Sequence, residues 1–140
     1  MALKLDATEI VTFVESVFDQ VRGDFVIERL DEDGMRVRMN VGERHLRPGG
    51  TVSGPSMFAL VDVSAYFMTI AHIGREALTV TTSCAIDFMR KPRAGADLVA
   101  EVTLLKMGRQ LSVSNVLVYS EGMDTPVAHA SVTYSIPPER

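Results

Sequence analysis

Hydrophobic positions along the chain follow two different spacings, and each spacing predicts a different kind of element. Near the N-terminus apolar side chains recur every three to four residues, the period of one helix face: Ile10, Phe13, Val14, Val17, Phe18 and Val21. Asp6 or Thr8 is placed to cap this helix, and Glu9 stands where a capping box with Asp6 requires it. Gly23 is the predicted end of the helix.

Two strands are predicted after this helix, over Phe25 to Leu30 and over Met35 to Asn40. Asp33-Gly34 separates the two alternating runs, and an Asp-Gly pair in that position favours a β-hairpin. The segment from Val41 to Gly50 contains several glycines and a proline, so it is predicted to be a loop.

A second helix is predicted from about Ser53 to His72, and apolar residues occupy all of its sides. Such a helix is expected to be buried rather than half solvated. Pro55 suits the first turn, where its missing N–H costs nothing, and Ser53 is placed to cap the helix. Asp62 is the only charged residue between Arg47 and His72.

Four strands are predicted in the second half of the chain. In the first of them Val80, Thr82, Cys84, Ile86 and Phe88 alternate with Thr81, Ser83, Ala85 and Asp87. The others cover Leu98 to Leu105, Leu111 to Tyr119 and Ala128 to Ile136. Because the connections are short, we expect successive strands to be antiparallel neighbours. The order predicts an α+β fold, an antiparallel sheet of about six strands wrapped around one long central helix, with an extra N-terminal helix.

Composition and charge limit the function classes. A chain of 140 residues is most simply one domain, 1–140. Lys and Arg number 14 and Asp and Glu 18, so the net charge is 14 − 18 = −4, which argues against a nucleic-acid partner. Cys84 alone forms neither an intramolecular disulfide nor a cysteine zinc cluster, and the three histidines lack metal-site spacing, so no metal is expected. With no signal peptide and no long uncharged run, we expect a cytoplasmic protein without membrane contact.

Three segments together resemble the hotdog-fold acyl-CoA thioesterases, in particular the phenylacetate-pathway type. Ser53-Gly54-Pro55 stands where that family has a His-Gly-Gly turn, and Asp62 stands where it has an acid seven residues after the second glycine. The segment from Asp87 to Ala96 is similar to the family's strand end and basic turn. The segment from Lys106 to Gln110 resembles the family's Gly-Arg turn. Ser53 and Pro55 depart from the family pattern, as does Arg47 at a position often held by Asn.

The resemblance implies hydrolysis of a small or medium acyl-CoA thioester, with three residues at the chemistry. A carboxylate in an apolar helix is costly unless it is paired or functional, and Asp62 is expected to act as nucleophile or general base. The Gly54 N–H, at a helix N-terminus, is the expected oxyanion donor, although a glycine before a helix-starting proline is also an ordinary structural feature. Ser53 either caps the helix or lies near the thioester.

The substrate-binding residues implied by the resemblance are Arg47, Pro55, Tyr66, Arg90, Arg93 and Arg109. Arginines match the phosphates of coenzyme A, which is part of the substrate and not a separate cofactor. For any single arginine a solvated charged turn is the simpler explanation, and Tyr66 could equally be a core residue. The family places its site between two protomers, so a homodimer or a homotetramer made of two dimers is expected.

Three other functions remain open from the sequence. A non-catalytic acyl-CoA binding module would fit the loss of the family's His and second Gly. An enoyl-CoA hydratase or dehydratase on the same fold would need a His paired with an acid near the central helix, where Ser53 stands instead. A purely structural oligomer is the last alternative.

Overall fold

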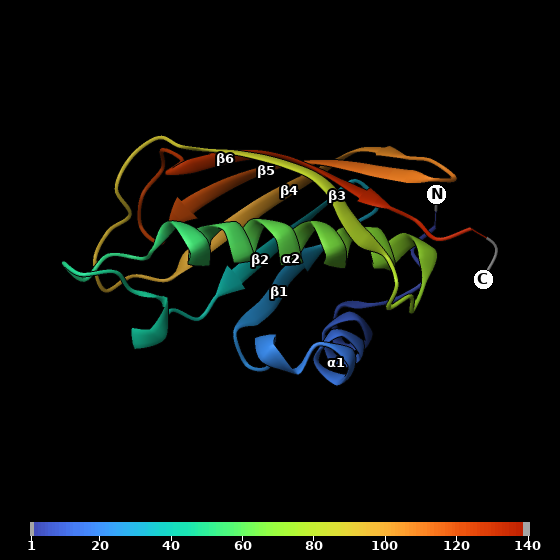
Figure 1. The fold of residues 1–140 in the computed structure, drawn as a ribbon, viewed down its shortest axis with the longest axis horizontal. Coiled ribbons are helices and arrows are strands. Elements are labelled where there is room, and N and C mark those ends of the chain that lie inside the picture. Colours follow the sequence, from blue (N-terminus) through green and yellow to red (C-terminus); the bar gives the residue numbers. More distant parts are fainter. Residues whose placement is uncertain (1, 139–140) are drawn as a thin grey trace.

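A long helix runs along the inner face of one six-stranded sheet in the computed structural model, which describes residues 2–138 (Figure 1). The elements are α1 (Ala7–Val17), β1 (Phe25–Leu30), β2 (Gly34–Met39), α2 (Gly54–Ile73), β3 (Val80–Phe88), β4 (Leu98–Met107), β5 (Leu111–Ser120) and β6 (Ala128–Ser135). Short 3-10 turns cover Asp19–Val21 and Glu43–His45. The predicted α+β architecture is confirmed, and the predicted strand boundaries agree within two residues.

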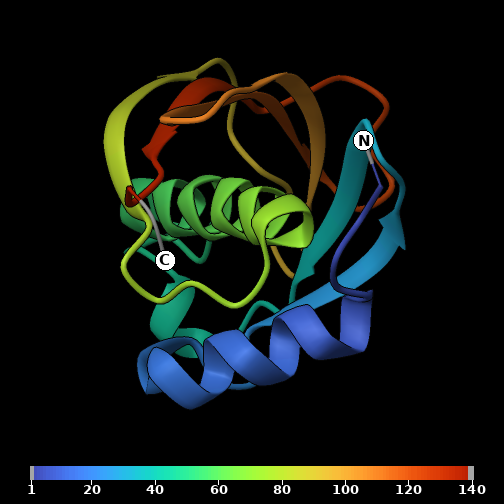
Figure 2. The ribbon, with the colours of Figure 1, turned by 90° about the vertical axis from the view of Figure 1, so that its right-hand side faces the viewer.

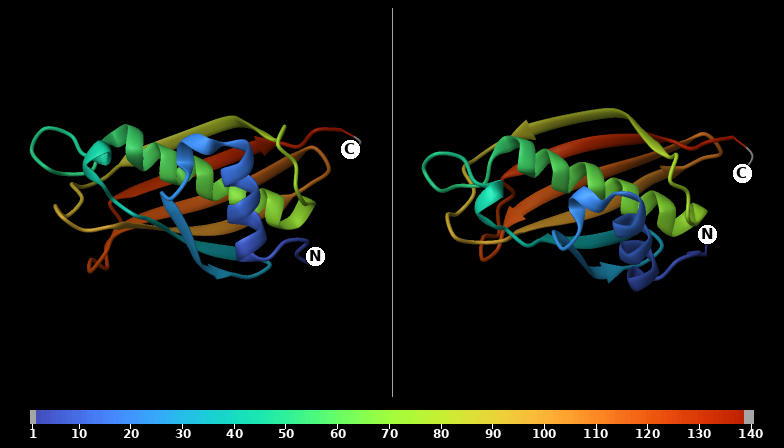
Figure 3. Two further views of the ribbon diagram at one scale, coloured as in Figure 1. Left: turned by 90° about the horizontal axis from the view of Figure 1, so that it is seen from below. Right: turned by 60° about the horizontal axis from the view of Figure 1, so that its bottom comes forward.

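The sheet wraps around α2, and α1 lies on the other side of that helix (Figure 2). Side chains from both layers meet in one core, in which Leu60, Phe67 and Ile70 of α2 are fully buried. Strands β2, β4 and β5 supply the sheet side of this core, with Val37, Leu98 and Val116. Seen from below, α1 and α2 cross the strands at different angles, with β1 beneath α1 (Figure 3).

The strand order is β1-β2-β4-β5-β6-β3, with every neighbouring pair antiparallel. The expectation that β3 and β4 are neighbours is therefore wrong, because β3 pairs with β6 at the edge of the sheet. The nine residues 89–97 that join β3 to β4 reach at most about 30 Å. Three strand spacings amount to only about 14 Å, so this short loop can cross to the middle of the sheet.

Local chemistry sets both ends of α2. The Ser53 hydroxyl accepts a hydrogen bond from the Ser56 N–H at 3.2 Å, and Pro55 lies in the first turn. Gly74 follows the last turn with φ of 98°, a conformation that glycine adopts without strain. By length and composition α2 could also cross a membrane, but 72% of its apolar window is buried inside the fold. In this structure it is the core helix.

The first helix begins as predicted and ends earlier. Asp6 and Glu9 form the predicted capping box, with the Glu9 N–H donating to the Asp6 carboxylate at 2.8 Å. The helix stops at Val17 instead of Gly23, and Val17 and Phe18 are 49% and 39% exposed instead of buried. The Glu15 carboxylate accepts from the Gly23 N–H at 2.8 Å, so the chain turns back on the helix before another turn can form.

We expect Asp6→Ala to lower the free energy of unfolding by about 1 kcal/mol, because the first turn of α1 loses its side-chain acceptor. Urea unfolding followed by circular dichroism measures the change. Asp124→Ala, in an exposed turn, is the matched control and should stay within about 0.5 kcal/mol of the parent chain. Equal stabilities of the two variants would contradict a role for the capping box.

Candidate active site

Asp62 lies near the middle of α2, half buried, on the side of the helix that faces β3. Its Oδ1 atom accepts hydrogen bonds from the Thr81 hydroxyl at 2.6 Å and from the Tyr134 hydroxyl at 2.7 Å. Within residues 2–138 no hydrogen bond is recorded to the other carboxylate oxygen, Oδ2. One oxygen of the carboxylate, Oδ1, is thus held by the fold through two hydroxyl donors.

A β-bulge brings Thr81 to this position. Thr81 pairs with Tyr134, whereas Ser83 pairs with Thr133, so Thr82 is the extra residue of β3. Directly opposite residues of an antiparallel pair share one face of the sheet, so Thr81 and Tyr134 both project toward α2. Without the bulge, side chains would alternate between the two faces of β3 from Cys84 back to Thr81, and Thr81 would point away from α2.

Two stacked tyrosines border the carboxylate. The rings of Tyr66 and Tyr134 lie 5.7 Å apart with an angle of 14° between their planes. Burial, followed by the charge of Glu76, raises the pKa of Tyr66 to about 12, and the Tyr66 hydroxyl donates to the Glu76 carbonyl at 3.1 Å. Burial, followed by the charge of Asp62, raises the pKa of Tyr134 well above its usual range. Both phenols therefore keep their protons at neutral pH.

The residues predicted at the helix start do lie together. Ser53 caps α2, and its hydroxyl is 3.0 Å from that of Ser56. Gly54 is the first residue of the helix, so its N–H has no carbonyl acceptor within the helix. The Phe88 ring, at the end of β3, is 3.5 Å from the place where a side chain on Gly54 would begin. An exposed Arg47 lies in the preceding loop, where its N–H bonds to the Thr51 carbonyl at 2.9 Å.

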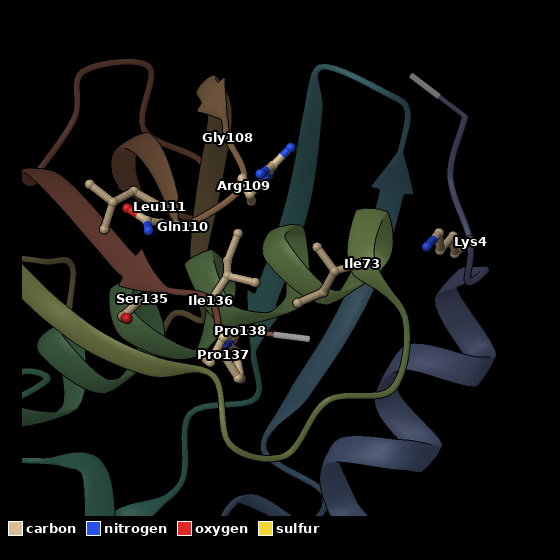
Figure 4. Close-up of a pocket in the computed structure, with 10 residues that line it drawn as sticks. All are labelled: Lys4, Ile73, Gly108, Arg109, Gln110, Leu111, Ser135, Ile136, Pro137 and Pro138. Atoms are coloured by element: carbon tan, nitrogen blue, oxygen red, sulfur yellow. The ribbon is translucent and has the colours of Figure 1, made fainter. Parts of the chain in front are cut away.

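The predicted arginines lie at two opposite ends of the helix. Arg90 and Arg93 are exposed in the loop after β3, where the Arg90 guanidinium donates to the Pro126 carbonyl and the Arg93 N–H donates to the Ser120 hydroxyl at 2.8 Å. Arg109 lies at the other end, in an open pocket of about 1160 Å³ (Figure 4). That pocket is lined by Lys4, Ile73, Gly108, Arg109, Gln110, Leu111, Ser135, Ile136, Pro137 and Pro138.

One chain does not bring the acid and the oxyanion donor to the same point. Eight residues of helix separate Gly54 from Asp62, which corresponds to about 12 Å along the axis. A single carbonyl group cannot contact both. Within one chain, the predicted catalytic pair is therefore not brought together.

The histidines and the cysteine have structural environments. His45 accepts from the Gly42 N–H through Nδ1 at 2.8 Å, and its buried Nε2 is 3.6 Å from the Asp24 carboxylate. Burial, with a smaller contribution from the Arg44 charge, lowers the pKa of His45. His72 bonds to the Glu32 carbonyl at 2.9 Å. Burial, with a smaller contribution from Asp62, raises the pKa of the half-buried Cys84 thiol, which disfavours the nucleophilic thiolate.

Across residues 2–138, no group of three or more His, Cys, Asp and Glu residues could hold a metal ion.

Comparisons with known proteins now identify the family. The sequence profile of the thioesterase superfamily matches residues 49–127, and the chain belongs to this superfamily of thioester hydrolases. The span includes both Gly54 and Asp62. The resemblance seen in the sequence is therefore confirmed. No curated protein sequence matches the chain.

Solved structures agree with this assignment and with the hotdog fold. A candidate thioesterase from a Silicibacter species is 55% identical, with a TM-score of 0.92 over 99% of this chain and 96% of that one. The phenylacetic acid degradation protein PaaI of Thermus thermophilus, in a mutant form, is 25% identical, with a TM-score of 0.70 over 90% of this chain and 99% of that one. Zebrafish thioesterase superfamily member 2, at 21% identity and a TM-score of 0.80 over 98% and 99% of the two chains, shows the same fold.

We expect alkaline pH to destabilise the fold partly through Tyr66. An unfolded tyrosine has a pKa of about 10, whereas burial raises the pKa of Tyr66 to about 12. The folded state therefore holds this proton more tightly, and its contribution is present below about pH 10 and is lost as the pH rises toward 12. Urea unfolding at several values from about pH 8 to about pH 11 should show a shallower loss of stability for Tyr66→Phe than for the parent chain.

Tyr119→Phe is the control for this measurement, because Tyr119 lies half exposed on β5 away from the helix. It should follow the parent chain more closely than Tyr66→Phe does. The same slope against pH for Tyr66→Phe and the parent chain would show that the buried phenol is not linked to stability.

Proposed function

We propose that the protein hydrolyses acyl-CoA thioesters, with Asp62 as nucleophile or general base and the Gly54 amide of a second copy as oxyanion donor. The observation that carries the proposal is the carboxylate of Asp62, whose Oδ1 is held by two hydroxyl donors while no such bond is recorded to Oδ2 within residues 2–138. Membership of the thioesterase superfamily supplies the reaction type. The substrate class and the residue roles are what we propose.

The free carboxylate oxygen supports two forms of the reaction. As a nucleophile, Oδ2 forms a bond to the thioester carbon, the C–S bond breaks, coenzyme A leaves as its thiolate, and water then cleaves the mixed anhydride. As a general base, Oδ2 takes a proton from a water molecule that attacks the carbon directly, the C–S bond breaks, and coenzyme A leaves as its thiol after taking up a proton. In both forms negative charge develops on the carbonyl oxygen, where the N–H of Gly54 would stabilise it.

The proposed homodimer joins the β3 edges of two copies. Within the described chain β3 pairs only with β6, so its other edge is open. Apolar side chains surround this edge, and Phe58, Leu78, Val80 and Phe88 are 38%, 75%, 56% and 51% exposed. A second copy related by a two-fold axis would cover them and would run its α2 in the opposite direction. The helix start of one copy would then approach Asp62 of the other.

The same reversal supports a shared site for coenzyme A. Arg90 and Arg93 lie near the start of α2, and Arg109 lies in the pocket near its end. In a two-fold dimer with antiparallel helices, the basic loop of one copy approaches the Arg109 end of the other. The phosphates of coenzyme A would be bound by arginines of both copies.

The geometry disfavours the hydratase alternative. Hydration of an enoyl thioester needs a histidine and an acid that can reach the substrate. His45 is the histidine closest in sequence to the helix start, but both of its ring nitrogens face protein groups and Nε2 is buried from solvent. Asp62 lacks a histidine partner among its recorded hydrogen bonds within residues 2–138.

We expect Asp62→Asn to reduce the turnover of acyl-CoA substrates by at least about 100-fold, because the amide neither attacks as a carboxylate nor accepts the proton of water. Thiol release from a panel of acyl-CoAs of different chain lengths, followed with a chromogenic disulfide reagent, measures the effect. Asp33→Asn, an exposed residue of the β1–β2 turn, should retain the parent activity. A parent chain that binds acyl-CoA in calorimetry without releasing thiol would instead be the non-catalytic binding module.

Subunit complementation tests the site shared between two copies. Gly54→Pro removes the proposed oxyanion donor at a helix position where proline is tolerated, and it should be inactive, as should Asp62→Asn. When equal amounts of the two variants are unfolded together and refolded, half of the dimers are mixed, and each contains one intact site. About a quarter of the parent activity should return. No recovery in a mixture shown by mass spectrometry to contain mixed dimers would place both groups in one chain.

A further inference from the structure

The Tyr134 hydroxyl is the group on β6 that contacts Asp62, and it makes two contacts with that residue. It lies 2.7 Å from Oδ1 and 2.9 Å from the Asp62 backbone carbonyl. The Tyr134 side chain is buried, with 5% of the residue exposed. Because a phenol has one proton, it donates to the carboxylate and the carbonyl in turn or shares the proton between them.

Three constraints fix the position of this hydroxyl. Tyr134 is paired on one side with Thr81 of β3 and on the other with Ser112 of β5, so its backbone is held within the sheet. Its ring is stacked on Tyr66 of α2. The hydroxyl is therefore held by rigid elements on both layers, which is the condition for precise placement of a reacting group.

The titratable groups around Asp62 stay neutral at ordinary pH. Burial followed by the Asp62 charge raises the pKa of Tyr134, and burial is the first cause of the raised pKa of Tyr66 on α2 and of Cys84 on β3. Tyr134 is thus a permanent donor to the carboxylate.

We propose that Tyr134 is a positioning residue for the thioesterase reaction, one that fixes Oδ1 of Asp62 and thereby directs Oδ2 toward the substrate. This inference rests on the proposed function, because it assigns Tyr134 a role only through Asp62. Thr81 donates to the same oxygen from the neighbouring strand. With both donors on Oδ1, rotation of the carboxylate would break two hydrogen bonds to a charged group, so the reacting oxygen is held in one orientation.

The test compares Tyr134→Phe with Tyr119→Phe, which removes a hydroxyl on the opposite face of the sheet. Phenylalanine keeps the ring stack with Tyr66 and loses the donor. We expect kcat to fall about tenfold, the cost of losing one hydrogen bond to a charged group, with KM within about twofold because Tyr134 does not contact the substrate. The loss should appear in kcat and not in KM, which distinguishes a positioning effect on Asp62 from a loss of substrate binding.

A merely structural role would lower the melting temperature of Tyr134→Phe and leave the kcat of the folded variant equal to that of Tyr119→Phe. That result, or a kcat within about twofold of the parent chain, would overturn the proposal. If Tyr134→Phe fails to fold, 3-fluorotyrosine at position 134 keeps the ring and the hydroxyl and makes the phenol more acidic and a stronger donor. It should keep kcat within about twofold of the parent chain, and a roughly tenfold loss of kcat with the hydroxyl still present would also overturn the proposal.

Two controls separate this inference from the proposed function. If Asp62→Asn hydrolyses acyl-CoA at the parent rate, the proposed function fails whatever Tyr134 does. If Asp62→Asn is inactive while Tyr134→Phe matches Tyr119→Phe in kcat, the hydrolase proposal stands and the positioning role is refuted.

Discussion

The structure depends on how a carboxylate is accommodated in an otherwise apolar helix. Asp62 interrupts the apolar surface of α2, and a charge in such a place is unfavourable unless polar groups replace the water it loses. Two hydroxyls on neighbouring strands, Thr81 and Tyr134, supply that replacement. Because the donors stand on the sheet and the acceptor on the helix, the polar contact also fixes how the two layers are placed against one another.

Much of the fold was predictable because it depends on local periodicity. The α2 segment is apolar on all sides, and apolar and polar residues alternate along the strands. The elements and their boundaries therefore follow from the local spacing of apolar residues. Asp6 with Glu9, and Ser53 with Pro55, mark the helix starts through capping chemistry that acts within four residues. Asp62 could be singled out from sequence because it is the only charge in a long uncharged stretch.

Long-range pairing could not be predicted in the same way. The short connection after β3 suggested that β4 was its neighbour, but a loop of that length is long enough to cross three strand spacings. The contact between Thr81 and Asp62 was not predicted, because the bulge at Thr82 reverses which face of the sheet the residues before it point to. Tyr134 carried a usable signal, since a tyrosine on the inward face of a strand needs a partner for its hydroxyl. Which partner it has depends on strand order, which the local pattern does not contain.

The two edge strands of the sheet, β1 and β3, differ in length and in what packs against them. Each edge strand contains one bulge, but β1 is short and packs against α1, whereas β3 is longer and its outer edge pairs with no strand within residues 2–138. Short or covered edges resist the addition of another strand. Within residues 2–138, β3 therefore offers the longer open edge for another strand. If two copies pair through β3 as proposed, each uses that edge, and the assembly would close as a pair instead of growing into a fibre.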